Sequence, residues 1–202
     1  RMIIEVCAES YEYAVKAEKA GADRIELCKD LHLDGLTPNY ESAKRTIDTL
    51  DIPVFILIRP RGGDFIYSDE EFELMKSDIV KFKEMGCRGI VSGVLNSDNS
   101  IDIKKTKELV ELSRPLEFTF HRAFDKVNNP LNEIENLIEL GIDRVLTSGQ
   151  KDKAIDGLVL LEQLNSISKN RIKIMPGSGI NKSNIVNFIN FEEIHGSFKN
   201  GF

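Results

Sequence analysis

Short runs of apolar residues alternate along this chain with longer amphipathic segments. Eight apolar runs have the length and composition of buried strands: Met2–Cys7, Arg24–Cys28, Val54–Ile58, Gly89–Gly93, Leu116–Phe120, Arg144–Thr147, Ile172–Met175 and Glu193–His195. Seven segments between them space their apolar residues as helices do: Tyr11–Ala20, Tyr40–Leu50, Asp69–Met85, Ile103–Leu112, Leu131–Leu140, Ala154–Ser168 and Lys182–Ile189. This alternation predicts a parallel sheet joined by right-handed crossovers.

Eight strand units favour closure into an α/β TIM-type (β/α)8 barrel. An open flavodoxin-like sheet uses about five strands and would leave three without a place. The 202 residues lie near the lower limit of roughly 200 for such a barrel, so we expect a single TIM-barrel domain over residues 1–202. Only Gly196–Phe202 follow the last predicted strand, so we expect the final helix to be absent or truncated.

A short internal repeat supports the barrel. Gly21, Gly86 and Gly141 each end a helical segment and lead within a few residues into a predicted strand. Glycine adopts the left-handed conformation that ends a helix, so the chain can turn there at once into a buried strand.

Composition and charge narrow the classes of partner. Apolar residues make up 41% and charged residues 30% of the chain, as in a typical globular domain, and the net charge is −6. A negative net charge argues against nucleic acid or an anionic membrane as partner. No apolar run approaches the ~20 residues of a membrane span, and the start lacks a signal-peptide pattern. Three cysteines do not indicate a disulfide framework, so we expect a reducing, cytoplasmic location.

The first two predicted strands end in the same pattern, Ile-Glu-apolar-Cys, placed 21 residues apart. Side chains alternate between the faces of a strand, so Glu5 and Cys7 share one face, as do Glu26 and Cys28. A carboxylate is costly between strand and helix layers. We therefore expect this face to line the barrel interior, near the C-terminal strand ends where such barrels build their sites.

Paired thiolates on neighbouring strands, which lie ~4.8 Å apart, could hold one metal ion, and soft sulfur ligands favour Cu(I). Cys7 and Cys28 are therefore the candidate metal ligands, with Cu(I) the candidate ion. Two alternatives stay open: the cysteines are small core residues, or, less compatibly with a reducing compartment, they form a disulfide. Cys87 precedes the fourth strand, at the opposite end of the barrel, and is expected to be structural.

Basic residues follow the third and fifth strands, where Arg59, Arg61 and Arg122 could hold an anion bidentately. His121 and Asp125, with Glu5 and Glu26, are candidate acids and bases. The alternative is a buried ion network that only fills the mouth of the barrel.

Small residues end strands six to eight. Ser148, Gly149, Gly177 and Gly179 would let backbone N–H groups approach an oxyanion, with help from a helix beginning near Asn181. The alternative is that these residues only form tight turns.

Several longer motifs together resemble the CutC copper homeostasis family from about residue 2 to residue 197. They are Glu5-Val6-Cys7, the segment Gly21–Cys28, Gly35-Leu36-Thr37-Pro38, the segments Ile58–Phe65 and Thr119–Asp125, and Leu146–Gln150. The resemblance implies a cytoplasmic TIM-type barrel that forms homo-oligomers and handles copper, with the family's Cu(I)-binding cysteines at Cys7 and Cys28. Family members continue beyond the strand-eight motif.

Two functions follow from these observations. One is copper homeostasis through Cu(I) binding by Cys7 and Cys28. The other is an enzyme that acts on a small phosphorylated or carboxylated molecule through the Glu/Arg/His/Asp site, which would explain the arginines and His121 as the copper function does not. An interaction protein with a degenerate site is a weaker third option. No organic cofactor is predicted.

Overall fold

The structure is a computed structural model that describes residues 1–201. Its strands are β1 (Ile3–Ala8), β2 (Arg24–Leu27), β3 (Val54–Leu57), β4 (Gly89–Ser92), β5 (Glu117–Phe120), β6 (Arg144–Thr147), β7 (Lys173–Pro176) and β8 (Glu193–Gly196). Its α-helices are α1 (Tyr11–Lys19), α2 (Tyr40–Thr49), α3 (Asp69–Met85), α4 (Ile103–Ser113), α5 (Pro130–Glu139) and α6 (Leu158–Ser168). Short 3₁₀ helices are η1 (Leu31–Leu33), η2 (Arg122–Lys126), η3 (Ala154–Gly157) and η4 (Ile185–Phe188).

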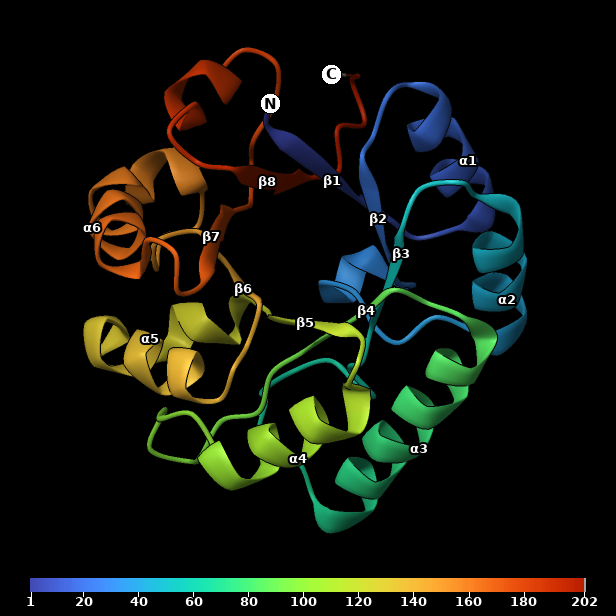
Figure 1. Cartoon of the computed structure of the whole chain (residues 1–202), viewed down its shortest axis with the longest axis horizontal. Coiled ribbons are helices and arrows are strands. Elements are labelled where there is room, and N and C mark those ends of the chain that lie inside the picture. The colour runs from blue at the N-terminus through green and yellow to red at the C-terminus, as the bar shows by residue number, and fades with distance from the viewer. Residues whose placement is uncertain (202) are drawn as a thin grey trace.

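The strands form one parallel sheet in the order β7-β6-β5-β4-β3-β2-β1-β8. The two ends of that order, β7 and β8, lie side by side, and the sheet curls into a nearly closed barrel with the helices outside it (Figure 1). The predicted TIM-type barrel is confirmed. Gly21, Gly86 and Gly141 have φ values of 105°, 97° and 74°, so the repeated helix-to-strand turn is also confirmed.

The prediction of an α-helix over Lys182–Ile189 is wrong. This segment holds only η4 (Ile185–Phe188). The Asn181 side chain accepts hydrogen bonds from the backbone N–H groups of Ser183 and Asn184, and Asn184 Oδ1 accepts one from Asn181 N. These local bonds compete with a helical ladder and favour a tight turn. No helix therefore begins near Asn181 to supply a dipole to the mouth.

One smaller difference concerns a helix boundary. The segment predicted as one helix from Ala154 begins as η3, and α6 starts only at Leu158. Between β8 and Gly201 the described residues form no helix, which agrees with the expectation for that stretch.

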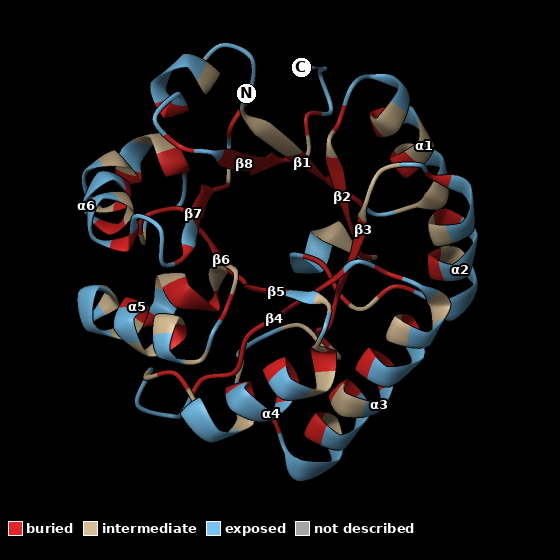
Figure 2. Ribbon diagram, viewed as in Figure 1, coloured by how far each residue is buried: buried red, intermediate tan, exposed pale blue. Residues whose placement is uncertain are grey.

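The buried hydrophobic residues form two clusters. Every strand is mostly buried (Figure 2). The larger group fills the space between strands and helices. The smaller one lies inside the barrel and consists of Cys7, Cys28, Phe55, Leu57 and Val91. The barrel interior is thus apolar beside the cysteines.

Candidate functional site

Three strands bring the lining side chains of the site together. In the register of the sheet, Cys7 on β1 lies opposite Glu26 on β2, and Glu5 on β1 lies opposite His195 on β8. Cys7, Glu26 and His195 line a pocket of about 930 Å³ at the C-terminal ends of the strands, and Glu5 is fully buried beneath them. The predicted inward direction of Glu5, Cys7, Glu26 and Cys28 is therefore confirmed.

The two cysteines of the repeated motif approach each other closely. Cys7 Sγ lies 3.7 Å from Cys28 Sγ, both thiols are free, and both are buried. This separation is far longer than the 2.03–2.05 Å of a disulfide bond. The hydrogen bond with Cys28 and burial raise the pKa of the Cys7 thiol well above its usual range, although a hydrogen bond from His195 opposes the shift. The raised pKa favours the protonated thiol form of Cys7.

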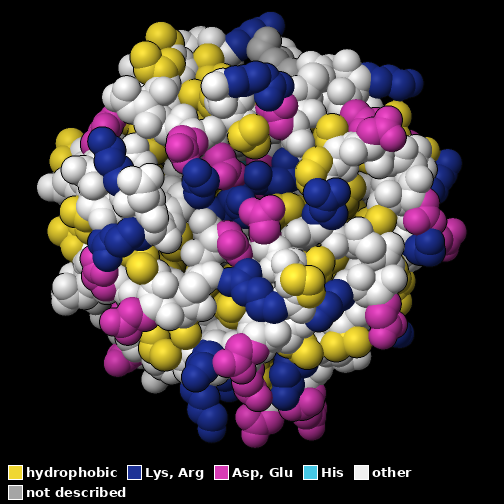
Figure 3. Space-filling model, in the orientation of Figure 1, with side chains coloured by type: hydrophobic (Ala, Val, Ile, Leu, Met, Phe, Trp, Pro, Cys, Tyr) yellow, Lys and Arg dark blue, Asp and Glu magenta, His cyan; other side chains and the backbone are white. Residues whose placement is uncertain are grey.

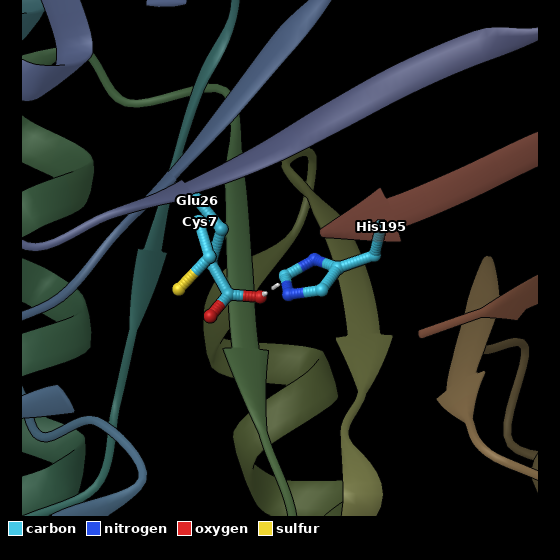
Figure 4. A group of neighbouring side chains, drawn as sticks. All are labelled: Cys7, Glu26 and His195. Atoms are coloured by element: carbon cyan, nitrogen blue, oxygen red, sulfur yellow. Dashed lines mark ion pairs between the residues drawn. The ribbon is translucent and has the colours of Figure 1, made fainter. Parts of the chain in front are cut away.

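His195 lies between two carboxylates. Its Nδ1 is 2.7 Å from Glu5 Oε1 and 3.7 Å from Glu26 Oε2. Figure 4 shows the imidazole turned toward Glu26 and Cys7. Burial opposes protonation, but the charge of Glu26 and hydrogen bonds to Cys7 and Glu5 raise the pKa of His195 well above its usual range. These carboxylates on β1 and β2 therefore favour the protonated form of the His195 imidazole.

The two carboxylates next to His195 differ in environment. Burial would raise the pKa of Glu5, but the Arg24 guanidinium and His195 hold it at about 2. Burial raises the pKa of Glu26 to about 7, and its Oε2 atom has no hydrogen-bond partner. Two glutamates from the same repeated motif therefore have different pKa values, because only Glu5 accepts a short hydrogen bond from an arginine.

An ion network lies below the pocket. Arg24 donates from Nε to Glu5 Oε2 (2.6 Å) and from Nη2 to Glu193 Oε1 (2.5 Å). Arg144 donates from Nε to the same Glu193 oxygen (3.0 Å) and from Nη2 to Glu117 Oε1 (2.6 Å). Both guanidinium groups also lie over the Phe55 ring, at 4.7 and 5.2 Å from its centroid. The network fixes Glu5, and through Glu5 it orients His195.

Arg24, Arg144, Glu193 and His195 were not among the residues expected from the sequence to form the site. Each occupies an inward position of a predicted strand, so the alternation that singled out Glu5 and Cys7 could also have found them.

On the face displayed in Figure 3, basic and acidic side chains mix around the centre of the molecule, with no large patch of one sign.

The arginine after β3 stabilises loops at the mouth. Arg59 Nη1 donates to the carbonyl oxygens of Leu33 (2.6 Å) and Gly35 (3.1 Å), and Nη2 donates to that of Gly63 (2.9 Å). Its Nε atom is buried without a partner, and the residue lines the pocket. The Nε–H group of Arg59 is therefore available to a ligand.

The other two predicted anion-binding arginines have carboxylate partners. Arg61 Nε donates to Glu71 Oε2 (2.6 Å), and its Nη2 donates to Asp64 Oδ1 (3.1 Å). Arg122 Nε donates to Asp125 Oδ2 (2.8 Å), and its Nη2 donates to Ser148 Oγ (3.1 Å). Arg122 lines the pocket and Arg61 does not line it.

Asp125 lies on η2 and accepts hydrogen bonds from the loop after β6. Its donors include Thr147 Oγ1 (2.5 Å), Ser148 Oγ (3.0 Å) and the backbone N–H groups of Ser148 and Gln150. Nearly all of its acceptor positions are therefore used within the protein, as expected of a carboxylate that fixes a loop.

His121, at the end of β5, has one free ring nitrogen. Its Nδ1 accepts a hydrogen bond from Ala123 N (3.1 Å), so Nε2 carries the proton in the neutral ring, and this buried atom has no partner. Burial and the charges of Arg59 and Arg122 lower the pKa of His121 to about 3. The Phe65 ring packs on it, with ring centroids 4.9 Å apart. His121 is thus a neutral donor on the wall of the pocket.

The small residues predicted to bind an oxyanion have different surroundings. Ser148 is buried and bound to Asp125. A Cβ atom on Gly149 would lie 2.3 Å from Gly157 O, so this glycine permits close backbone packing. Gly177 N donates to Thr147 O (3.1 Å). Gly179, with φ of 72°, lines the pocket together with Ser178. Of the four predicted residues, only Gly179 lines the pocket.

The fold and the site define a (β/α)8-barrel protein whose interior carries a cysteine pair beside a Glu–His–Glu group. The sequence profile of the CutC family matches residues 2–200. This chain belongs to the CutC family.

Related proteins agree with this assignment. The chain is 48% identical over 183 residues to the human copper homeostasis protein cutC homolog, covering 91% of this chain and 67% of the human protein. It is 44% identical over 201 residues to the family protein CutC of Pasteurella multocida, covering 98% of this chain and 82% of that protein. A crystal structure described as CutC from Streptococcus agalactiae superposes with a TM-score of 0.92 at 31% identity, covering 98% and 99% of the two chains. Among the described residues, no helix is long and apolar enough to cross a membrane.

Proposed function

We propose that this protein binds Cu(I) through the Cys7 and Cys28 thiolates as part of copper homeostasis. The observation that carries the proposal is the 3.7 Å separation of the two sulfur atoms at the base of the pocket. Metal–sulfur bonds of about 2.3 Å can span up to roughly 4.6 Å between two sulfurs, so one ion reaches both without a change of fold. Here copper is cargo that the protein takes up and gives away.

The surroundings of the pair suit a soft, weakly hydrated ion. Phe55, Leu57 and Val91 pack against the two cysteines and exclude water from one side, while Cys7 lines the pocket on the other. Thiolate ligands favour Cu(I) over hard cations. Binding must displace the thiol protons, because the Cys7 pKa is raised in the free protein. The names of the CutC relatives support the copper role.

A second function, binding of a small carboxylated or phosphorylated molecule, is supported by three unpartnered polar atoms. Arg59 Nε, His121 Nε2 and Glu26 Oε2 are buried without hydrogen bonds, and all three residues line the pocket. Such atoms are rare in native proteins, and a ligand that fills the pocket would satisfy them. In this proposal Arg59 and His121 hold the anion, and Glu26 acts as acid or base. The loops and the ion network around the anion are supported by the other predicted site residues: Glu5, Asp125, Arg61, Arg122, Ser148, Gly149 and Gly177.

We also propose a cytoplasmic location and a homo-oligomeric state. The location is supported by two adjacent cysteines that remain free thiols, as a reducing compartment allows. The oligomer is supported by exposed apolar side chains on one segment, where Val186 and Ile189 are 64% and 70% exposed.

An anaerobic Cu(I) titration against a chromophoric competitor tests the copper function. Wild type is expected to bind one Cu(I) per chain, and Cys7→Ser, Cys28→Ser and the double variant are expected to lose at least about 100-fold in affinity. Cys87→Ser is the matched control, because Cys87 is also buried and free but precedes β4 at the opposite end of the barrel. Equal Cu(I) affinity of wild type and the double variant would exclude the proposed site.

A further inference from the structure

A second set of metal-ligand atoms shares Cys7 with the proposed copper pair but does not include Cys28. The Cys7 thiol, the Glu26 carboxylate and the His195 imidazole each offer one ligand atom, and these three atoms lie within 4.8 Å of one another. They come from β1, β2 and β8, and Figure 4 shows the Glu26 carboxylate facing the His195 imidazole with the Cys7 sulfur on its other side. We propose that Cys7, Glu26 and His195 form a separate site for a divalent transition metal ion, with Zn²⁺ the best match.

The chemistry of the donors distinguishes this site from the cysteine pair. One sulfur, one imidazole nitrogen and one carboxylate oxygen are each ligands of Zn²⁺, at about 2.3, 2.0–2.1 and 2.0–2.2 Å. A carboxylate is a poor ligand for Cu(I), which prefers soft thiolates. Tetrahedral coordination would place these ligand atoms roughly 3.3–3.6 Å apart. The side chains therefore have to move by no more than about 1.5 Å from the 4.8 Å limit to close around an ion.

The Glu26 carboxylate has an oxygen atom that needs a partner, and a metal ion would supply one. Its side chain is almost completely buried, and its Oε2 atom accepts no hydrogen bond. Among residues 1–201, the only basic group at ion-pair distance is His195, whose Nδ1 is 3.7 Å from Oε2 and is already bound to Glu5. A buried carboxylate oxygen without a hydrogen bond is costly, and a cation at this point would compensate it.

His195 is oriented as a metal-ligating histidine commonly is. Its Nδ1 is engaged by Glu5 at 2.7 Å, which leaves Nε2 for the metal. Carboxylates often bind the second nitrogen of such a histidine, which fixes its tautomer and orientation. Glu5 is itself held by Arg24 Nε at 2.6 Å. The buried ion network below the pocket thus serves as the outer shell of this site.

The site has three protein ligands and opens into the pocket. Zinc sites with three protein ligands keep a fourth position for water or substrate, whereas structural zinc sites use four protein ligands. Cys7, Glu26 and His195 all line the same pocket as Arg59 and His121, so a ligand bound there could reach the fourth position. Both metal sites need Cys7, so Zn²⁺ and Cu(I) compete for this protein.

Anaerobic titration with Co²⁺, as a spectroscopic substitute for Zn²⁺, tests the inference. Wild type is expected to bind one Co²⁺ with a thiolate-to-cobalt charge-transfer band, and Zn²⁺ is expected to displace it. Glu26→Gln and His195→Ala should each weaken Co²⁺ binding by at least about 10-fold. Cys28→Ser should keep the band while it loses Cu(I), and Cys87→Ser should change neither titration. Far-ultraviolet circular dichroism checks that each variant is folded.

Three outcomes would overturn the inference: no thiolate band in wild type, unchanged Co²⁺ affinity in the nearly isosteric Glu26→Gln variant, or loss of the band in Cys28→Ser. The third outcome would mean that Co²⁺ binds the cysteine pair. The copper proposal is judged separately by the Cu(I) titration of Cys28→Ser, so either proposal can fail while the other stands.

Discussion

Nδ1 of His195 lies 2.7 Å from Oε1 of Glu5, so the last strand of the barrel is joined to the first by a buried ion pair. Arg24 on β2 donates to the other oxygen of Glu5 and also to Glu193 on β8. The side chains of three neighbouring strands are therefore bound into one charged group below the pocket. Its stability and the geometry of the site depend on the same bonds.

Replacement of Arg24 tests this group. Arg24→Met keeps much of the side-chain volume but leaves Glu5 and Glu193 each without one cationic partner. Breaking a buried pair by removal of one member costs about 3–5 kcal/mol, because the remaining charge stays buried. We expect a decrease of this size in the free energy of unfolding, measured by urea denaturation at pH 7.

Arg171→Met is the matched control for Arg24→Met. Arg171 also binds a carboxylate through two nitrogens, each 2.8 Å from an oxygen of Glu135, but the two side chains are 41% and 48% exposed. Solvent screens this pair, so the expected loss is much smaller than that of Arg24→Met. Equal losses in the two variants would contradict a structural role for the buried network.

The barrel could be predicted from the sequence because hydrophobic periodicity is local information. The spacing of apolar residues within ten to twenty positions predicts each strand and most helices. Lys182–Ile189 has a helical spacing but is not an α-helix, because Asn181 and Asn184 bind nearby backbone groups instead. That competition depends on side-chain geometry, which the apolar pattern does not contain.

The site could be predicted in part. Strand alternation places Glu5 and Cys7 inside the barrel without knowledge of any partner. Arg24 and Glu193 meet only because the barrel closes, and they are 169 residues apart in the chain. The hydrogen bonds of Arg59 go to backbone carbonyl oxygens, which no residue pattern reveals. An arginine that holds loops therefore looks the same in sequence as one that binds an anion.

A substitution of Asp125 tests whether this residue fixes a loop. Asp125→Asn removes a carboxylate charge that accepts hydrogen bonds from Arg122 and from the hydroxyl groups of Thr147 and Ser148. Hydrogen bonds to a charged group contribute about 1.5–3 kcal/mol each, so a loss of about 3 kcal/mol in the free energy of unfolding is expected. Amide exchange at Gln150, whose N–H donates to Asp125, should accelerate.

Asp64→Asn is the comparison for Asp125→Asn. Asp64 also binds an arginine three residues away, Arg61, but its side chain is 64% exposed. We expect this change to cost less than about 1 kcal/mol. If Asp125→Asn left the free energy of unfolding unchanged and abolished binding of small anions, a role of Asp125 in the binding site would be favoured over the loop role.

The last prediction concerns the pH dependence of stability through His121. Burial lowers its pKa from 6.5 to about 3, with further contributions from Arg59 and Arg122. Between these two values the unfolded chain binds a proton that the folded protein does not. Stability contributed by this group is therefore complete above pH 6.5 and is lost as the pH falls toward 3. From pH 7 to pH 5 the loss should be about 2 kcal/mol.

His121→Asn should remove this contribution, because the Asn oxygen can accept the hydrogen bond from Ala123 N but does not titrate. Wild type should lose about 2 kcal/mol more than the variant between pH 7 and pH 5, as measured by urea denaturation at both pH values. His32→Asn is the control, because His32 is exposed and should leave the difference unchanged. If wild type and His121→Asn had the same pH dependence, the pKa of His121 would be the same in the folded and unfolded states. The imidazole would then be protonated at pH 5 in the folded protein and would carry a positive charge beside Arg59 at that pH.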